Sequence, residues 1–299
     1  FLQGIFAKIE RHYIHSNSFN GSILTKLKCL FKLTLSIFEL RRYLREQRPT
    51  SVVGFGGYPS FPTLAAAISL GIPTIVHEQN SVLGRVNKLF APFVKAIALG
   101  FPQTQGIKPG YEAKTHFVGN PVRASYRDLK PGKKSTKFRL LIIGGSQGAK
   151  ILSDVVPAAI KLLPKKVQSN LVIHQQVRQN LIDETKAAYD GLKLKVDVQP
   201  FYNDLATLMN DCDLIISRAG ASSVTEITEL GKASILVPFK LAKDNHQFYN
   251  AQHLVRNNAA LMFEEDDLTP QSLAKELLDL IENQKNLSSL AKNAKKLGK

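Results

Sequence analysis

Three short segments rich in glycine, serine and threonine are the parts of this sequence best suited to hold a charged ligand. They are Gly54–Ser60, Gly144–Ala149 and Arg218–Glu226, and each follows an apolar run and precedes a helical pattern. Glycine lets the backbone approach a ligand without a Cβ atom, and the first turn of a helix presents unpaired N–H groups to an anion. The three segments therefore predict phosphate-binding loops at the carboxyl ends of strands, where α/β proteins bind ligands.

Two familiar phosphate-binding motifs do not fit these loops. The first segment reads Gly54-x-Gly56-x-x-Pro59 and lacks the third glycine of a dinucleotide-binding loop, although Glu78 stands near the place of a ribose-binding acid. The second segment lacks the Gly-Lys-Ser/Thr spacing of a Walker loop. A nicotinamide-dependent oxidoreductase is therefore disfavoured, and for any single loop a simple reversal of the chain remains the alternative.

Short apolar runs that alternate with helical patterns supply the elements that must position these loops. Because the runs are continuously apolar, they favour parallel strands that are buried on both faces. Strand, helix and strand in succession predict the α/β class with right-handed crossovers. The expected strands are 51–53, 73–76, 96–99, 116–118, 138–143, 171–174, 195–198, 214–217, 234–237 and 261–263.

A break in the pattern predicts two domains. Residues 126–137 are polar and basic and include Pro131 and Gly132, and the strand–loop–helix pattern starts afresh at Phe138. We therefore expect a first Rossmann-like domain at residues 1–125, a linker at 126–137 and a second Rossmann-like domain at 138–299.

The composition indicates a globular chain that binds an anion. The 299 residues carry a formal net charge of +16, and 44% of them are hydrophobic, which excludes a disordered chain. Cys29 and Cys212 are too few and too far apart for a disulfide scaffold or a metal knuckle, so a reducing compartment is expected. No apolar run is long enough to span a membrane.

The expected helix Ile23–Arg45 carries two apolar stripes on nearly opposite sides. Leu24, Leu27, Phe31, Leu35 and Phe38 form one stripe, and Leu30, Leu33, Ile37, Leu40 and Leu44 form the other. One stripe must face the sheet, and the other is either covered by a neighbouring element or docks on anionic lipid. For the lipid contact we expect Leu33, Ile37 and Leu40 to lie on the exposed side.

Four sequence segments together resemble the MurG family, the N-acetylglucosaminyltransferases of bacterial cell-wall synthesis. They are the stretch from VVGFGGYPS to HEQN, VGNPVR at 118–123, GGSQGA at 144–149, and the stretch from SRAGASSVTE to DNHQFYNA at 217–251. The resemblance implies a GT-B fold, two Rossmann-like domains whose parallel sheets face a central cleft. It further implies that N-acetylglucosamine moves with inversion from UDP-GlcNAc to the C4 hydroxyl of lipid I, which gives lipid II for peptidoglycan synthesis.

The resemblance also implies the rest of the biochemical setting. No cofactor and no metal are expected, because helix N-termini and hydroxyl donors can stabilise a departing diphosphate. The expected partners are UDP-GlcNAc, lipid I and an anionic membrane surface, with no nucleic acid. The implied location is peripheral, on the cytoplasmic face of the bacterial inner membrane, with roles in cell shape and division.

Residue by residue, the resemblance implies a UDP-GlcNAc site that draws on several motifs. Asn80, Arg123 and Ser146 are expected at the donor, with Ser146 on its diphosphate, and the backbone of Tyr202 at the uracil. Glu226 is expected to accept from the ribose, and Gln247 to bind the sugar hydroxyls. The donor segment as a whole comprises Ala221, Ser222, Ser223, Val224, Thr225 and Glu226.

Three of these residues also have a structural alternative. In these alternatives Asn80 only caps the next helix, Arg123 only makes a salt bridge in the linker, and Glu226 only stabilises its own helix as an acid of the first turn.

On the acceptor side, Gly56, Gly57 and Tyr58 are expected to border the lipid diphosphate. The family's first strand and its Gly-Gly-Thr-Gly-Gly-His loop have no counterpart in this sequence. That loop carries the histidine usually proposed as the general base, which an inverting transfer requires. The catalytic residue therefore stays unknown, and we expect this chain as given to lack transferase activity.

Two other classes of function share some of these features. A UDP-GlcNAc 2-epimerase has the same two-domain fold, but HEQN and the basic helix Ile23–Arg45 favour a lipid-linked acceptor. A non-catalytic module that binds nucleotide sugars or nucleic acid is compatible with the charge, although no nucleic-acid-binding motif is present.

Overall fold

The computed structural model of the protein describes residues 10, 12–13, 23–130, 132, 135–145 and 148–298. These residues form two compact units. Unit 1 contains the described residues up to Glu78, together with Leu83–Leu99 and Gly106–Phe117. Unit 2 contains Gln79–Val82, Gly100–Gln105 and the described residues from Val118 onward. Two loops from the first half of the sequence therefore belong to the unit that contains the second half.

Unit 1 is built on a parallel sheet with strand order β1-β2-β3-β4. Its register places Gly54, Val76 and Ile97 side by side on one face, and Val76 and Ile97 are fully buried there. On the other face Val53 is 46% exposed. The elements of unit 1 are α1 (Ile23–Gln47), β1 (Val52–Gly54), α2 (Gly57–Ser69), β2 (Thr74–Glu78), α3 (Arg85–Phe90), β3 (Ala96–Leu99), the 3-10 turn η1 (Glu112–Lys114) and β4 (Thr115–Phe117).

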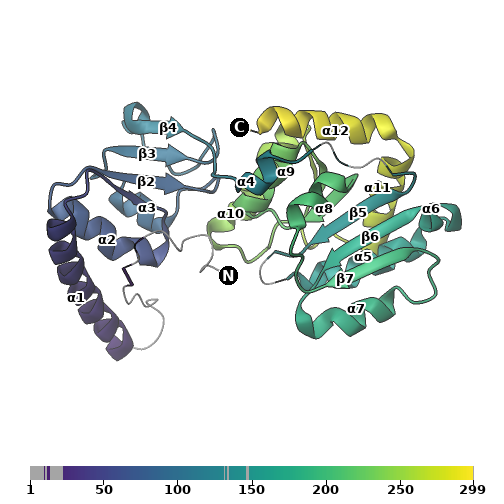
Figure 1. The fold of residues 1–299 in the computed structure, drawn as a ribbon, viewed down its shortest axis with the longest axis horizontal. Helices are drawn as coiled ribbons and strands as arrows, with labels where there is room; N and C mark the ends of the chain where they lie inside the picture. The colour runs from purple at the N-terminus through teal and green to yellow at the C-terminus, as the bar shows by residue number, and fades with distance from the viewer. Residues whose placement is uncertain are drawn as a thin grey trace. The chain divides into compact units, whose positions relative to one another are not determined.

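Helix α1 lies alongside α2 in unit 1 (Figure 1). Leu40 and Leu44 are buried in a cluster with Val52 and the alanines of α2. Phe31 and Phe38, on the opposite side of α1, are 65% and 67% exposed. The expectation that Leu33, Ile37 and Leu40 face outward was therefore wrong, because the stripe that contains Leu40 is the one that packs on α2. Leu24 and Leu27 lie outside the side chains that the structure describes.

Unit 2 is built on a six-stranded parallel sheet with the order β10-β9-β8-β5-β6-β7. The elements are α4 (Ala124–Arg127), β5 (Phe138–Ile143), α5 (Lys150–Leu162), α6 (Lys165–Ser169), β6 (Leu171–Gln176), η2 (Gln179–Leu181), α7 (Ile182–Ala188), β7 (Lys195–Gln199), α8 (Leu205–Asp211), β8 (Leu214–Ser217), α9 (Ala221–Leu230), β9 (Ala233–Leu236), η3 (Lys243–Asn245), α10 (His246–Arg256), β10 (Leu261–Met262), α11 (Pro270–Glu282) and α12 (Gln284–Leu297).

The central strands of the unit 2 sheet, β5, β8 and β9, are buried on both faces, as their continuous apolar runs predict. Leu140 and Ile142 of β5 enter a core shared with α5 and α11, whereas Leu141 and Ile143 enter a second core shared with α8, α9 and α10. Helices therefore cover the sheet on both sides. The predicted α/β class with two parallel-sheet domains is confirmed, and all ten expected strands are present with bounds within two residues of the prediction. None of the described helices is long and apolar enough to cross a membrane.

Candidate functional site

The order of strands in unit 2 places two of the glycine loops side by side. From β5 the chain proceeds to β6 and β7 on one side and returns to β8, β9 and β10 on the other. Strands β5 and β8 are therefore neighbours at which the direction of winding reverses, and Ile143 pairs with Ser217 at their carboxyl ends. The loops that begin at Gly144 and Arg218 leave this edge together. Such a reversal point is where open α/β sheets bind ligands.

The loop after β8 leads into the N-terminus of α9. Gly220 occupies the cap position and has no side chain with which to satisfy the first N–H groups of the helix, which begins at Ala221. These groups point along the helix axis, where the helix dipole favours an anion. Val224 belongs to the framework, because its side chain is 1% exposed and its N–H donates to the Gly220 carbonyl.

Glu226 and Arg123 are partners in unit 2. The Arg123 Nη2 atom lies 3.0 Å from Glu226 Oε1, and the carboxylate is 13% exposed. Hydrogen bonding to Glu226 raises the pKa of Arg123, and burial raises the pKa of the neighbouring Tyr126 to about 12. Glu226 lies beyond the first turn of α9, so the alternative of a first-turn acid was wrong. Arg123 does form a salt bridge, and its partner is the expected ribose acceptor.

The side chain of Asn80 is hydrogen-bonded to a buried asparagine of α10, Asn250. The Asn250 side chain donates to Asn80 Oδ1 at 3.1 Å and to the Ala219 carbonyl at 3.0 Å, and its own Oδ1 accepts from the Ser81 N–H at 2.8 Å. Asn250 is fully buried, so these bonds fix the loop Gln79–Val82 against unit 2. The alternative that Asn80 caps the next helix was wrong, because Gly84 caps α3.

A second amide, Asn120, ties the same loop to α9. Its Nδ2 donates to the Gln79 carbonyl at 3.0 Å and to Thr225 Oγ1 at 3.1 Å. Sequence reasoning gave no role to Asn120 or to Asn250. Both are amide residues inside the VGNPVR and DNHQFYNA motifs, and that position was the signal that could have identified them.

The remaining donor residues lie in unit 2 at the ends of other elements. Gln247, in the first turn of α10, accepts from the Phe239 N–H at 3.0 Å. Tyr202, which follows β7, donates its hydroxyl to the Asp197 carbonyl at 2.8 Å, and burial raises its pKa. Ser146 lies outside the described residues. Ala221, Ser222 and Ser223 supply the first turn of α9.

In unit 1, Gly56, Gly57 and Tyr58 lie at the start of α2, which begins at Gly57 and thus inside the glycine segment that was expected to precede the helix. Both glycines have positive φ, at 76° and 71°, so the turn requires them. The earlier start places Tyr58, which is 39% exposed, in the first turn of α2. Among the described residues, no group of His, Cys, Asp and Glu side chains has the arrangement of a metal site.

Comparisons with known proteins agree with this architecture. The model of the glycosyltransferase family 28 C-terminal domain matches residues 139–299, and that of the family's N-terminal domain matches residues 5–99. A UDP-N-acetylglucosamine–N-acetylmuramyl-(pentapeptide) pyrophosphoryl-undecaprenol N-acetylglucosamine transferase of Brucella canis is 42% identical, over 99% of this chain and 79% of the relative.

Two solved structures allow the transferase and the epimerase alternatives to be compared by sequence identity and TM-score. MurG of Acinetobacter baumannii is 33% identical, with a TM-score of 0.76 over 93% of this chain and 79% of the other. The UDP-GlcNAc 2-epimerase of Neisseria meningitidis, solved with UDP-GlcNAc, has a TM-score of 0.66 over 94% and 79% of the two chains, but is only 14% identical. That second likeness shows the fold alone, so the epimerase alternative is not favoured. The chain belongs to glycosyltransferase family 28, among the N-acetylglucosaminyltransferases of the MurG type.

Proposed function

We propose that this chain binds UDP-GlcNAc on unit 2, at the reversal point between β5 and β8, as the donor site of an enzyme that transfers N-acetylglucosamine to the C4 hydroxyl of lipid I. The observation that carries the proposal is the pairing of Ile143 with Ser217, which brings two glycine loops and the N-terminus of α9 to one edge. Unit 1 takes the role of the acceptor and membrane domain, with Gly56, Gly57 and Tyr58 beside the lipid diphosphate.

The diphosphate is assigned to the two loops at this edge. The first N–H groups of α9 are available to bind the diphosphate, and the family resemblance assigns Ser146 to it as well. When the sugar C1–oxygen bond breaks, negative charge grows on the departing UDP, and aligned N–H groups stabilise it without a cation. The acceptor hydroxyl forms the new bond at C1 and loses its proton to a general base.

The nucleoside and the sugar are assigned to the side chains around this edge. Glu226 accepts from the ribose hydroxyls, because a carboxylate paired with Arg123 through one oxygen keeps further acceptor capacity. Asn80, oriented by Asn250, and Gln247 bind the sugar hydroxyls. Tyr202 contributes its backbone at the uracil, since its hydroxyl is bonded to the Asp197 carbonyl.

Titration of UDP-GlcNAc by calorimetry tests the donor site. Replacement of Glu226 by Gln removes a charged acceptor, and we expect affinity to fall roughly 10- to 100-fold. Glu229→Gln makes the same change one turn further along α9 and is the matched control. Equal affinity of both variants for UDP-GlcNAc would remove Glu226 from the site.

The transfer step is tested separately with a lipid I analogue. The sequence contains no Gly-Gly-Thr-Gly-Gly-His loop, so we predict that these 299 residues bind UDP-GlcNAc without releasing UDP. Release of UDP that depends on the analogue would contradict the predicted inactivity while supporting the assigned reaction.

We also propose that unit 1 docks peripherally on the anionic, cytoplasmic face of the bacterial inner membrane, where its acceptor resides. Phe31, Leu35 and Phe38 form an exposed apolar stripe on α1, and the exposed Lys28 and Lys32 flank it. Apolar side chains enter the interface while basic residues meet anionic headgroups.

A groove of about 670 Å³ in unit 1 has a similar character. It is lined by Leu83, Leu89 and Ile107 together with Lys88 and Lys108. As on α1, the apolar side chains of this groove suit the apolar part of a lipid, and its lysines suit an anionic headgroup.

Sedimentation with anionic liposomes tests the membrane contact. We expect the triple replacement of Phe31, Leu35 and Phe38 by Ser to lower partitioning at least about tenfold, because several apolar side chains no longer enter the lipid. Leu162→Ser with Leu241→Ser removes comparably exposed leucines from unit 2 and is the control. Unchanged sedimentation of the triple variant would show that the stripe does not contact lipid.

A further inference from the structure

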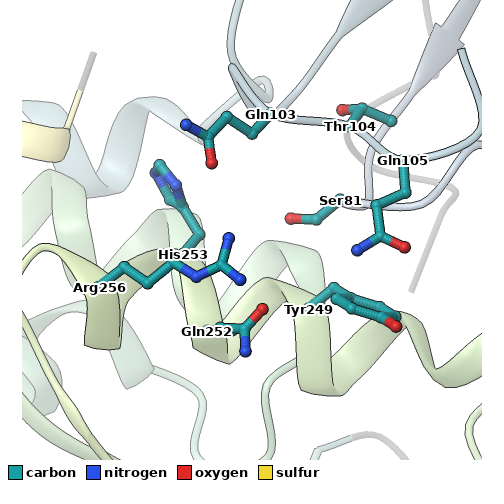
Figure 2. A pocket seen from close by; sticks show the side chains of 8 residues that line it. All are labelled: Ser81, Gln103, Thr104, Gln105, Tyr249, Gln252, His253 and Arg256. Atoms are coloured by element: carbon teal, nitrogen blue, oxygen red, sulfur yellow. The ribbon is translucent and has the colours of Figure 1, made fainter.

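Unit 2 contains a polar pocket on a side of α10 that the donor proposal does not use. The pocket has a volume of about 210 Å³ and lies between α10, Ser81 and the loop Gly100–Gln105 (Figure 2). From α10 it takes Tyr249, Gln252, His253 and Arg256. Their spacing of three, four and seven residues places them on one stripe of the helix. Asn250, which holds Asn80, is absent from this stripe and fully buried.

The chemistry of the pocket is uniform. Every residue that lines it is polar: hydroxyl groups come from Ser81, Thr104 and Tyr249, and side-chain amides come from three glutamines. The lining includes one guanidinium, that of Arg256, and no carboxylate. His253 packs edge-on against Phe101 at 5.5 Å, and burial lowers its pKa, so that it is neutral at pH 7. The pocket therefore offers many hydrogen-bonding groups and one fixed positive charge.

Ser81 supplies a second, independent observation. It is 3% exposed, and its hydroxyl has no hydrogen-bond partner among the described residues. Figure 2 shows the hydroxyl pointing into the pocket, as does the guanidinium of Arg256. The Ser81 backbone is fixed at both ends, since its N–H donates to Asn250 and its carbonyl accepts from the Gln105 N–H at 2.8 Å. A buried polar group without a partner is costly, and a ligand that supplies the partner removes that cost.

We propose that this pocket binds a small hydroxyl-rich molecule that carries one oxyanion, a sugar phosphate or a sugar acid. The Arg256 fork binds the phosphate or carboxylate in a bidentate manner. The glutamine amides and Tyr249 bind the hydroxyls, and the Ser81 hydroxyl gains its missing partner. The site is separate from the donor site, and the proposal does not rest on the assigned transferase activity.

Calorimetric titration of the full chain with four probes tests the proposal. D-Glucose 6-phosphate and D-gluconate represent the two sources of the oxyanion, inorganic phosphate lacks the hydroxyls, and D-glucose lacks the charge. We expect at least one of the two hydroxyl-bearing anions to bind roughly tenfold or more tightly than phosphate and glucose, also in the presence of saturating UDP-GlcNAc. Equal binding of all four probes, no binding of either anion, or displacement by UDP-GlcNAc would each overturn the proposal.

Two variants assign the binding to this pocket. Arg256→Gln should lower the affinity for the anion roughly tenfold or more. Lys161→Gln removes the same charge from α5 and should leave the affinity unchanged. Ser81→Ala should weaken binding while leaving the thermal stability of the ligand-free protein equal or higher, because it removes a group without a partner. Unchanged binding by Arg256→Gln would place the anion elsewhere.

Discussion

The two units use the same kind of parallel sheet in different ways. In unit 2 the winding reverses between β5 and β8, and all four residues of β8 and of β9 are buried. In unit 1 the described strands follow one another in chain order, and burial alternates along β1 and β3, whereas β2 is buried at four of its five residues. Loops that leave neighbouring strands at a reversal point form the usual ligand site of open α/β sheets, which supports the nucleotide site proposed on unit 2. The described part of unit 1 has exposed apolar side chains on α1 and a groove lined by apolar and basic residues, which support the proposed contact with a lipid surface.

Weakening the core of each unit in turn tests whether the two units unfold independently. Leu214 of β8 and Leu64 of α2 are both fully buried, and replacement of either by Ala should cost roughly 2–5 kcal/mol of unfolding free energy. We expect Leu214→Ala to accelerate native-state amide exchange in β5, β8 and β9 only, and Leu64→Ala to accelerate it in β1, β2 and β3 only. Faster exchange in both sheets with either variant would show that the two units unfold as one.

A matched pair of buried asparagines gives the next largest effect. Asn250 in unit 2 bonds three partners, and Asn87 in unit 1 donates to the His77 carbonyl and to Glu78. Replacement of either by Ala removes these buried hydrogen bonds and should cost roughly 0.5–1.5 kcal/mol of unfolding free energy for each bond lost.

Only Asn250→Ala should also lower UDP-GlcNAc affinity, by about tenfold, because only Asn250 orients Asn80. Chemical denaturation measures the stability of both variants, and calorimetry measures the affinity. An equal loss of affinity in Asn87→Ala would assign the donor to both units.

The glycine loops of the two units differ in why they need glycine. A Cβ on Gly144 would lie 2.5 Å from the Ala149 backbone nitrogen, so Gly144→Ala must distort the loop at the reversal point. A Cβ on Gly57 would contact only Pro59 at 3.5 Å, and the cost there is the positive φ, about 1–2 kcal/mol. We expect Gly144→Ala to lower UDP-GlcNAc affinity and Gly57→Ala to leave it unchanged. The reverse result in calorimetry would move the donor diphosphate to unit 1.

The smallest expected effect is a pH dependence that belongs to unit 2. Burial lowers the pKa of His253 below its usual 6.5, and Arg256 is the charged group that lines the same pocket. As pH falls below 6.5, the unfolded chain binds a proton that the folded chain does not, so the stability contributed by the neutral ring is lost.

His253→Gln should therefore lose less stability than the unchanged chain between pH 7.5 and 5.5, by at most about 1.4 kcal/mol, because only one pH unit separates 5.5 from the unfolded pKa of 6.5. His116→Gln alters an exposed histidine of unit 1 and is the control for denaturation at both pH values. A pH dependence that is the same in all three proteins would contradict the assignment.

The fold was largely predictable because each strand is marked by a local pattern in the sequence. Runs such as Phe138–Ile143 and Leu214–Ser217 are apolar on both faces and end at a glycine loop or a polar residue, so even their bounds are as expected. Helix α2 begins inside the glycine segment because its first turn accepts Gly57, Tyr58 and Pro59: N–H groups there have no partner within the helix, so proline is tolerated.

Long-range packing was not predictable from the sequence. Both stripes of α1 look alike in composition, and only the position of α2 decides that Leu40 is buried while Phe38 is exposed. The loop that contains Asn80 lies within the first half of the sequence, yet Asn250, 170 residues later, fixes it in unit 2. No local pattern marks such a bond, because an asparagine next to a helix reads equally well as a cap.

The pairing of β5 with β8 also determines when the proposed donor site can form during folding. Strands β6 and β7 are made before β8, and they add to one side of β5 through connections that are short by comparison. Because contacts between distant segments are slow to form, the three-strand sheet β5-β6-β7 should assemble first. During synthesis, Ile143 can pair with Ser217 only after β8 has left the ribosome. A nascent chain that ends before β8 therefore contains the loop after β5 but not the loop after β8.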